Sequence, residues 1–258
     1  MATYNELRVK GKNKKEVNSA LDNAENIWKK VEKEFLVEKA MRTFAAEAVT
    51  VPTKIPGYPF ISSGKPEVAN FIAFILDIRK STDHLLTAIS SAKASQLERV
   101  LYETTAINTA GALVIGNYNG GLTEYLGDGF LALFKVEDEK SPSEVYDAHN
   151  AAQDCINSAL DVVNEIISER YSLPKLAIGI GLAYSKAIVT IVGIENNLHP
   201  KAIGECVYRA SKLSGGYNEI NVDLKLKNLW PTSKDGKIRF NLYRKFYDVD
   251  GYLLEKKD

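Results

Sequence analysis

The stretches FIAFILDIRKST (71–82) and LTEYLGDGFLALF (122–134) decide the fold of this chain. The apolar run that opens the first stretch is too short for a buried helix and is typical of a central strand covered on both faces. The second stretch predicts two strands joined by a tight Gly-Asp-Gly turn. Asp77 ends the first strand and Asp128 lies in the turn. A hairpin packed beside the first strand would therefore bring these two carboxylates to one end of the sheet.

The first half of the chain alternates strands with helices. A helix is predicted to begin at Ser81-Thr82-Asp83 and to run through LERVLYETTAINTAG (97–111). The segment ALVIGN (112–117) is expected to form the next strand. A second helix is predicted within 141–170, with one apolar face made of Val145, Ala148, Ala152, Cys155, Ala159, Val162, Val163 and Ile166.

The second half continues the alternation. Two strands, KLAIGIGLAYS (175–185) and KAIVTIVGI (186–194), precede a loop, NNLHPKAIGE (196–205), and a short helix in GECVYRASKL (204–213). Further strands are expected in the tail. The order βαββαββα predicts an α+β, ferredoxin-like plan, in which helices flank a central, mostly antiparallel sheet.

Residues 1–66 differ in composition from residues 67–258. The residues Leu21, Ala24, Ile27, Trp28, Val31 and Phe35 recur at the spacing of an amphipathic helix. The segment VPTKIPGYPFISSGKPE (51–67) contains four prolines and cannot continue that helix. We therefore expect a helical N-terminal extension with a Pro-rich strap over 1–66 and a catalytic domain over 67–258.

Composition and charge exclude several classes of protein. The 258 residues carry 33 basic and 33 acidic side chains, so the net charge of zero argues against a chain that binds nucleic acid along its whole length. No apolar run reaches the ~20 residues of a membrane helix, and the charged N-terminus lacks the apolar core of a signal peptide. We expect a cytoplasmic protein without a membrane or nucleic-acid partner. The two cysteines, Cys155 and Cys206, are expected to be buried.

Asp77 and Asp128 are the first candidates for chemistry. Two carboxylates that approach closely repel each other and need a cation to stay ionised, and Mg²⁺ and Mn²⁺ prefer such hard oxygen ligands beside phosphate oxygens. The pair thus predicts a divalent-metal site for a triphosphate. The alternative is that each carboxylate only caps a turn or a helix.

The residues after Asp77 suggest an anion site. Backbone N–H groups at Ser81 and Thr82 would lie at a helix start, where the helix dipole favours negative charge. Arg79 and Lys80 would add positive charge, although both could equally be ordinary surface cations.

Four segments together resemble the class III nucleotide cyclases. DIRKST (77–82) and TEYLGDGFLALF (123–134) resemble the two metal-binding motifs of that family, and GIGLAYSKAIVTIVG (179–193) and GECVYRASKL (204–213) resemble two later motifs in the same order. The resemblance implies that Asp77, the backbone carbonyl of Ile78 and Asp128 bind two divalent ions, Mn²⁺ or Mg²⁺. It implies attack of the ribose 3′-oxygen on the α-phosphate with loss of pyrophosphate, in a homodimer with its active sites at the interface.

Two departures from the family pattern concern the base. Glu124 stands where adenylyl cyclases carry a lysine, and Lys201 stands where they carry an aspartate. Uracil and guanine offer a ring N–H donor and a carbonyl acceptor, which a Glu/Lys pair complements. A mismatched base would leave buried polar groups unpaired, at about 1–3 kcal/mol each. UTP or GTP is therefore favoured over ATP and CTP.

Further departures concern catalysis. Tyr208 replaces the asparagine that orients the ribose, and Lys212 replaces the arginine that stabilises the transition state, with Arg209 nearby. Tyr208 narrows the pocket, which favours UTP over GTP. In this combination the chain looks most like the pyrimidine cyclases of bacterial Pycsar antiphage systems, which make cyclic UMP or cyclic CMP. A cytidylate or guanylate cyclase, and a degenerate cyclase-like module that binds nucleotide without turnover, remain alternatives.

Overall fold

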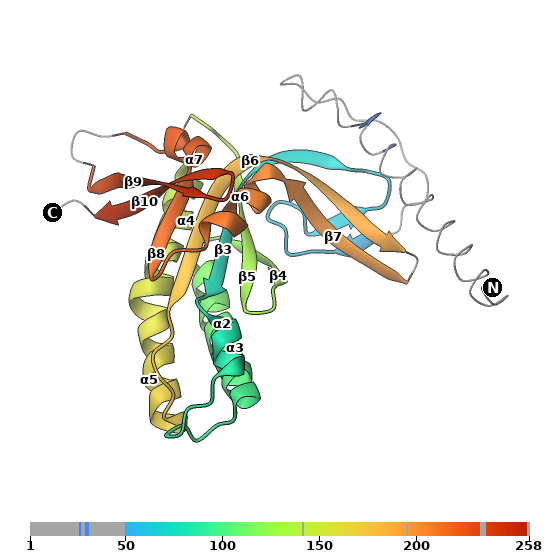
Figure 1. Cartoon of the computed structure of the whole chain (residues 1–258). Coiled ribbons are helices and arrows are strands. Elements are labelled where there is room, and N and C mark those ends of the chain that lie inside the picture. The colour runs from blue at the N-terminus through green and yellow to red at the C-terminus, as the bar shows by residue number, and fades with distance from the viewer. Residues whose placement is uncertain are drawn as a thin grey trace, which may run out of the picture. The chain divides into compact units, whose positions relative to one another are not determined.

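The computed structural model describes residues 26, 29, 30, 50–140, 142–194, 196–232 and 236–256 (Figure 1). The strands of these residues are β1 (Thr50–Pro52), β2 (Phe60–Ser62), β3 (Glu67–Ile78), β4 (Gly121–Tyr125), β5 (Gly129–Val136), β6 (Ile178–Ile194), β7 (Asn197–Gly204), β8 (Glu219–Asp223), β9 (Ile238–Phe246) and β10 (Val249–Lys256). The helices are α2 (Ser81–Leu86), α3 (Gln96–Asn117), α4 (Ser143–Asp154), the π-helical turn η1 (Cys155–Ala159), α5 (Leu160–Tyr171), α6 (Glu205–Leu213) and α7 (Leu224–Leu229). The N-terminal amphipathic helix expected around Trp28 lies outside the described residues.

The chain divides into two compact units. The small unit contains β1, β2, the first residues of β3, the second half of β6, and β7. The large unit contains residues 54–57, 70–187 and 204–258 and thus most of the predicted site residues. A domain boundary at residue 66 stays a prediction.

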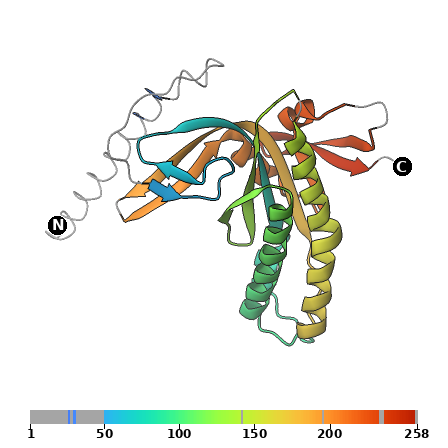
Figure 2. The ribbon, with the colours of Figure 1, turned by 180° about the vertical axis from the view of Figure 1, so that it is seen from behind.

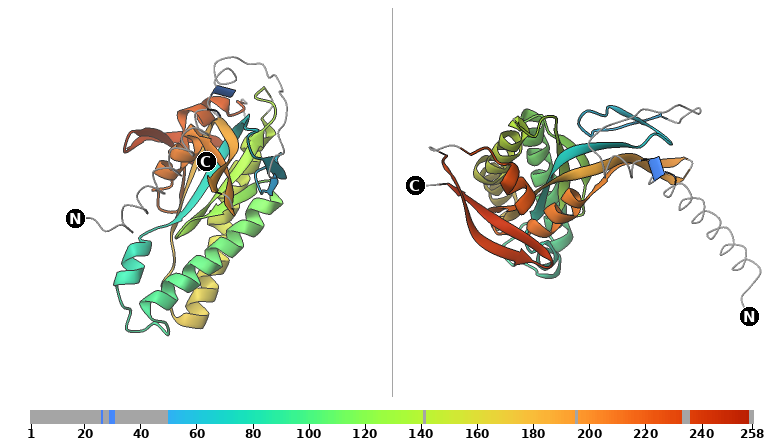
Figure 3. Two further views of the ribbon diagram at one scale, coloured as in Figure 1. Left: turned by 90° about the vertical axis from the view of Figure 1, so that its right-hand side faces the viewer. Right: turned by 90° about the horizontal axis from the view of Figure 1, so that it is seen from above.

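A mixed sheet organises the fold. Its strands follow the order β4-β5-β3-β6-β8-β10-β9, and β7 pairs with β6. β3 and β5 are antiparallel, as are β4 and β5, whereas β6 and β8 are parallel. β9 and β10 form a long antiparallel hairpin (Figure 3). The predicted α+β class is confirmed, with the central strand β3 paired to the hairpin β4–β5 through β5.

One face of the sheet in the large unit carries the main core. Alternate residues of β3 and β5, namely Ile72, Phe74, Leu76, Ile78, Phe130, Ala132, Phe134 and Val136, pack with buried residues of α3, α4 and α5. α3 and α5 lie side by side (Figure 2). Because side chains alternate between the faces of a strand, Asp77 belongs to the other face. None of the described helices combines the length and apolar character needed to cross a bilayer.

α6 lies against β6 on the face opposite the main core. Ile180 and Leu182 point into the core, and a Cβ on Gly181 between them would lie 2.0 Å from the carbonyl oxygen of Ala210. Only glycine permits this approach of helix and strand. The glycine spacing in β6 therefore fixes the position of α6, which carries Tyr208, Arg209 and Lys212.

The prediction of one helix after Asp77 was wrong. Two helices form, because Ser95 and Glu98 make a reciprocal capping box that starts α3 anew. The prediction of a strand at 112–117 was also wrong. Ile107, Gly111 and Ile115 lie four residues apart and are all buried, so this segment continues α3 to Asn117.

The predicted apolar face of the second helix was wrong in its last turns. Val162 and Ile166 are 53% and 43% exposed, whereas Val163 and Ile167 are buried. The turn η1 is the cause, because a π-helical turn contains an extra residue and rotates every later side chain. Cys155 lies in this turn, and both it and Cys206 are free and buried, as predicted.

β6 is one strand, although two were expected at 175–194. Ala183, Ser185, Ala187, Val189 and Ile191 are all buried at alternate positions. Ser185 does not interrupt the strand, since its hydroxyl accepts a hydrogen bond from the Cys206 N–H at 2.8 Å.

The segment expected as a loop at 196–205 is mostly β7. Pro200 is accommodated there, as prolines are in edge strands. The tail contains the expected strands, but residues 224–229 form α7, whose N-cap is Asp223.

Candidate active site

The ladder between β3 and β5 brings Asp77 and Asp128 together, as the sequence predicts. Asp77 pairs with Gly129, and the Ile78 N–H donates to the backbone oxygen of Asp128 at 3.0 Å. A Cβ on Gly129 would lie 1.9 Å from the carbonyl oxygen of Leu76. The residue after Asp128 must therefore be glycine for the two strands to meet at this point.

The electrostatics of this strand end favour a cation. The pKa of Asp77 is raised from its ordinary 3.8 to about 6, first by burial and then by the negative charge of Asp128, while Arg79 lowers it in part. A side-chain hydrogen bond with Asp128 also contributes to the raised pKa of Asp77. A divalent ion bound between them would keep both groups ionised.

Arg79 and Ser81 are the immediate partners of the carboxylates. Arg79 Nη1 lies 2.5 Å from Asp77 Oδ2 and donates to the carbonyl oxygen of Ser214 at 3.4 Å. The Ser81 hydroxyl donates to Asp128 Oδ2. Arg79 is therefore the counter-ion of Asp77 and also links the end of β3 to the C-terminal end of α6.

The donor set fits a divalent metal ion. Across the described part of the chain, no group of three or more His, Cys, Asp and Glu side chains is placed to hold an ion. Two carboxylates with the neighbouring Ile78 carbonyl supply part of a hard-oxygen shell. Phosphate oxygens of a substrate would supply the rest, which is the usual arrangement for Mg²⁺ at a nucleotide.

The start of α2 differs from the prediction. Ser81 was expected as the N-cap, but the cap is Lys80, which adopts a left-handed φ of 59° and makes no side-chain cap hydrogen bond. The Ser81 hydroxyl lies in the first turn of this helix and donates to Asp128. Lys80 and Thr82 are exposed at this turn. Both remain candidates for contact with a triphosphate.

α6 presents the other predicted catalytic residues. Arg79 lies near the Ser214 cap of this helix. Lys212 Nζ lies 5.5 Å from the ring centroid of Tyr208 and 4.8 Å from that of Tyr247. Arg209 instead forms an ion pair with Glu205, its Nε lying 2.6 Å from Oε1.

Tyr247 is the residue of this group that the sequence analysis missed. It lies in the turn between β9 and β10, where the alternation of FNLYRKF and VDGYLL could have indicated a hairpin. Its contact with Lys212 joins two elements far apart in the sequence, so no local pattern reveals it.

The two predicted base-recognition residues lie in different units. Glu124 is half-buried on β4 in the large unit, opposite Leu131 of β5. Lys201 is half-buried on β7 in the small unit. Their roles stay predictions.

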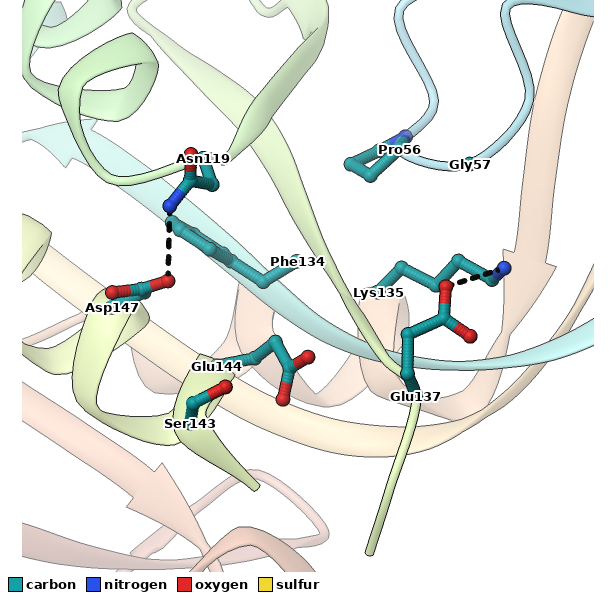
Figure 4. Close-up of a pocket in the computed structure, with 9 residues that line it drawn as sticks. All are labelled: Pro56, Gly57, Asn119, Phe134, Lys135, Glu137, Ser143, Glu144 and Asp147. Carbon is teal, nitrogen blue, oxygen red and sulfur yellow. Dashed lines mark hydrogen bonds and ion pairs between the residues drawn. The ribbon is translucent and has the colours of Figure 1, made fainter. Parts of the chain in front are cut away.

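One pocket of the large unit, of about 290 Å³, contains none of the predicted site residues (Figure 4). Asn119 donates to Asp147 at 3.4 Å, and Lys135 pairs with Glu137 at 2.8 Å. Asp77 and Asp128, by contrast, are half-buried and lie outside this pocket.

Solved structures of nucleotide cyclases share this architecture. The guanylyl cyclase Cya2 is 17% identical over 74% of this chain and 94% of its own, with a TM-score of 0.62. The adenylyl cyclase CyaB from P. aeruginosa is 16% identical over 75% of this chain and 97% of its own, also with a TM-score of 0.62. The chain has the class III nucleotide cyclase fold. The guanylate cyclase domain of RhGC from Catenaria anguillulae, solved in complex with GTP, matches this cyclase fold at 16% identity over 76% of this chain and 100% of its own, with a TM-score of 0.55.

No protein-family model and no curated protein matches the sequence. At these identities the structural likeness establishes the fold. Within the cyclase fold, the activity must be argued from the residues of this chain.

Proposed function

We propose that the chain is a metal-dependent nucleotidyl cyclase that converts UTP to 3′,5′-cyclic UMP and pyrophosphate. One observation carries the proposal: Asp77 and Asp128 are held against each other at the end of β3, in a chain with the cyclase fold. Holding two half-buried carboxylates close together costs free energy unless a cation is bound. That cost is explained if the pair holds Mn²⁺ or Mg²⁺.

Asp77, Asp128 and the Ile78 carbonyl would hold two metal ions. When bound, the ions lower the pKa of the ribose 3′-hydroxyl and neutralise charge on the triphosphate. Arg79 would then leave Asp77 and become available to phosphate oxygens, a change for which its flexible side chain is suited. Ser81 keeps the Asp128 carboxylate oriented by its hydrogen bond.

In the reaction, the 3′-oxygen forms a bond to the α-phosphorus while the bond from that phosphorus to the β-phosphate oxygen breaks. Pyrophosphate leaves, and the hydroxyl proton passes to solvent. Lys212 would stabilise the charge that develops on the phosphate oxygens. Lys80 and Thr82, exposed at the start of α2, would contact the triphosphate. Arg209 would hold α6 through Glu205.

UTP is the proposed substrate because of Glu124, Lys201 and Tyr208. The Glu124 carboxylate would accept from the uracil ring N–H, and Lys201 would donate to a carbonyl oxygen. Cytosine offers a ring acceptor at the corresponding position, which a carboxylate repels. Tyr208 is 52% exposed on α6, so its ring can border a base pocket and favour a pyrimidine over a purine.

The active form is proposed to be a homodimer in the cytoplasm, with active sites between the two chains. This arrangement is the one that the resemblance to class III nucleotide cyclases implies. By its resemblance to Pycsar cyclases, the chain would make its cyclic nucleotide as an alarm signal during phage infection. Expression with and without Asp128→Ala during phage challenge tests this role by plaque count.

The decisive experiment incubates the full chain with Mn²⁺ and each of the four nucleoside triphosphates separately, with cyclic monophosphates measured by mass spectrometry. Cyclic UMP as the main product is expected. If cyclic GMP or cyclic CMP is the sole product, the chain is a nucleotidyl cyclase, but its substrate is GTP or CTP and not UTP. Conversion of none, with nucleotide still bound, would establish a binding module instead.

A further inference from the structure

Lys212 is surrounded by aromatic rings from two separate elements. Tyr208 precedes it by one helical turn on α6, and Tyr247 reaches it from the β9–β10 turn. Both ring centroids lie within the ~6 Å at which a ring attracts an ammonium group. We call Tyr208 and Tyr247 together the aromatic clamp.

The backbone at Tyr247 is strained. Phe246 pairs with Val249, so the hairpin loop consists of Tyr247 and Asp248 alone. Tyr247 has a φ of 55°, in the left-handed region where such turns usually have glycine or asparagine. Its side chain is 78% exposed, so burial of the ring does not offset the strain. An unfavourable residue at an exposed turn points to a role for its side chain.

The neighbours of Tyr247 fix this turn against α6. A Cβ on Gly215, just after α6, would lie 3.3 Å from the Phe246 ring, and a Cβ on Gly251 would lie 2.3 Å from Leu213 Cδ2. The strand residues on both sides of the turn thus contact the end of the helix that carries Lys212. The position of the Tyr247 ring over Lys212 follows from this packing.

We propose that the aromatic clamp positions the Lys212 ammonium for the triphosphate, with Tyr247 as a positioning residue. This inference rests on the proposed cyclase function. A lysine has a flexible stem and lacks the planar fork by which arginine grips phosphate. Two rings restrict the conformations of that stem and keep its charge at one place. By the resemblance to the cyclases, Lys212 stands in place of an arginine and Tyr208 in place of an asparagine. The rings of Tyr208 and Tyr247 would then compensate for the loss of the arginine's planar fork.

The first test replaces Tyr247 in the full chain. Tyr247→Asn removes the ring and places a residue that tolerates left-handed φ, so the thermal midpoint should stay equal or rise. We expect kcat to fall about tenfold, with KM changed less than about threefold. Tyr247→Phe keeps the ring and should restore kcat to within about twofold of wild type. A kcat for Tyr247→Asn near that of wild type, or a loss of stability in parallel with activity, would overturn the proposal.

A double-mutant cycle tests whether the ring acts through Lys212. In a Lys212→Met background, Tyr247→Asn should change the residual kcat less than about twofold. An equal loss in both backgrounds would show that Tyr247 acts elsewhere.

A third measurement separates the clamp from the activity. The ε-methylene NMR signal of Lys212, assigned by its loss in Lys212→Met, should be shifted upfield by the two rings and move downfield in Tyr247→Asn. An unshifted signal in the wild type overturns the clamp even if cyclic UMP forms. A shifted signal in a protein that converts no nucleotide supports the clamp and refutes the cyclase.

Discussion

Gly129 lies directly opposite Asp77 in the β3–β5 ladder, and a Cβ on Gly129 would lie 1.9 Å from the backbone oxygen of Leu76. The strand that carries one carboxylate of the proposed metal site and the turn that carries the other are therefore in contact through a position that admits no side chain.

Gly129→Ala should destabilise the fold and abolish turnover, because backbone atoms must move to admit the methyl group. A loss of about 2–4 kcal/mol in the free energy of unfolding is expected by urea denaturation. Gly127→Ala is the matched control, since a Cβ there meets no atom within 4 Å. Equal stability of the two variants would contradict the close approach.

The raised pKa of Asp77 predicts a pH dependence in the metal-free chain. Below about pH 4, Asp77 is protonated in both the folded and the unfolded chain. Between about pH 4 and 6 it ionises only in the unfolded chain, so the free energy of unfolding falls as the pH rises. Above about pH 6 Asp77 is ionised in both states, and the full destabilisation is present. Asp77→Asn should therefore remove about 2 kcal/mol of destabilisation at pH 8 and have little effect at pH 4. Urea melts in EDTA at the two pH values measure this. A constant difference between the two proteins would argue against the shift.

Asp128→Ala should lower kcat at least about a thousandfold while the chain still folds, because a carboxylate of the proposed metal site is lost. Asp83→Ala, an exposed carboxylate on the neighbouring α2, serves as the control and should stay within about twofold of wild type. Circular dichroism checks folding, and calorimetry with Mn²⁺ checks binding. Undiminished turnover in Asp128→Ala would refute the metal assignment.

Glu103 should be important for stability. It is 1% exposed on α3 and pairs with Arg99 Nε at 2.8 Å and with His84 Nδ1 of α2 at 2.7 Å. Glu103→Ala leaves the buried Arg99 without its partner, at about 3–5 kcal/mol. Glu165→Ala, an exposed glutamate on α5, should change the free energy of unfolding by less than about 0.5 kcal/mol.

Glu124 should select the base. In Glu124→Gln the new side-chain amide can both donate and accept a hydrogen bond, whereas the carboxylate only accepts. Discrimination between UTP and CTP should therefore weaken. The ratio of kcat/KM for UTP to that for CTP is expected to fall about tenfold or more, measured in competition. An unchanged ratio would remove Glu124 from the base pocket.

The sequence predicted the site best where the pattern was local. The apolar run ending at Asp77 and the glycines around Asp128 were enough to place both carboxylates at one strand end. The contacts of Ser81 with Asp128 and of Arg79 with Ser214 depend on tertiary packing, so neither could be derived from spacing.

The fold was predicted less well where local and tertiary preferences differ. The β-branched residues Val114 and Ile115 favour a strand, but burial of Ile115 against the core keeps them helical. The π-helical turn at Cys155 moved the buried position from Ile166 to Ile167, and no regular helical period predicts such an insertion.

The two buried cysteines have a practical consequence. Burial raises the pKa of the Cys155 thiol to about 12 and also raises that of Cys206. Neither is therefore a thiolate near neutral pH, and neither should react with a maleimide. A cysteine introduced at an exposed position of α2 away from the proposed triphosphate contacts, such as Leu86, would be labelled selectively in the otherwise native chain. Spin labels or fluorophores placed there could then test whether two copies of the chain assemble when nucleotide is added, through the separation between the labels on their α2 helices.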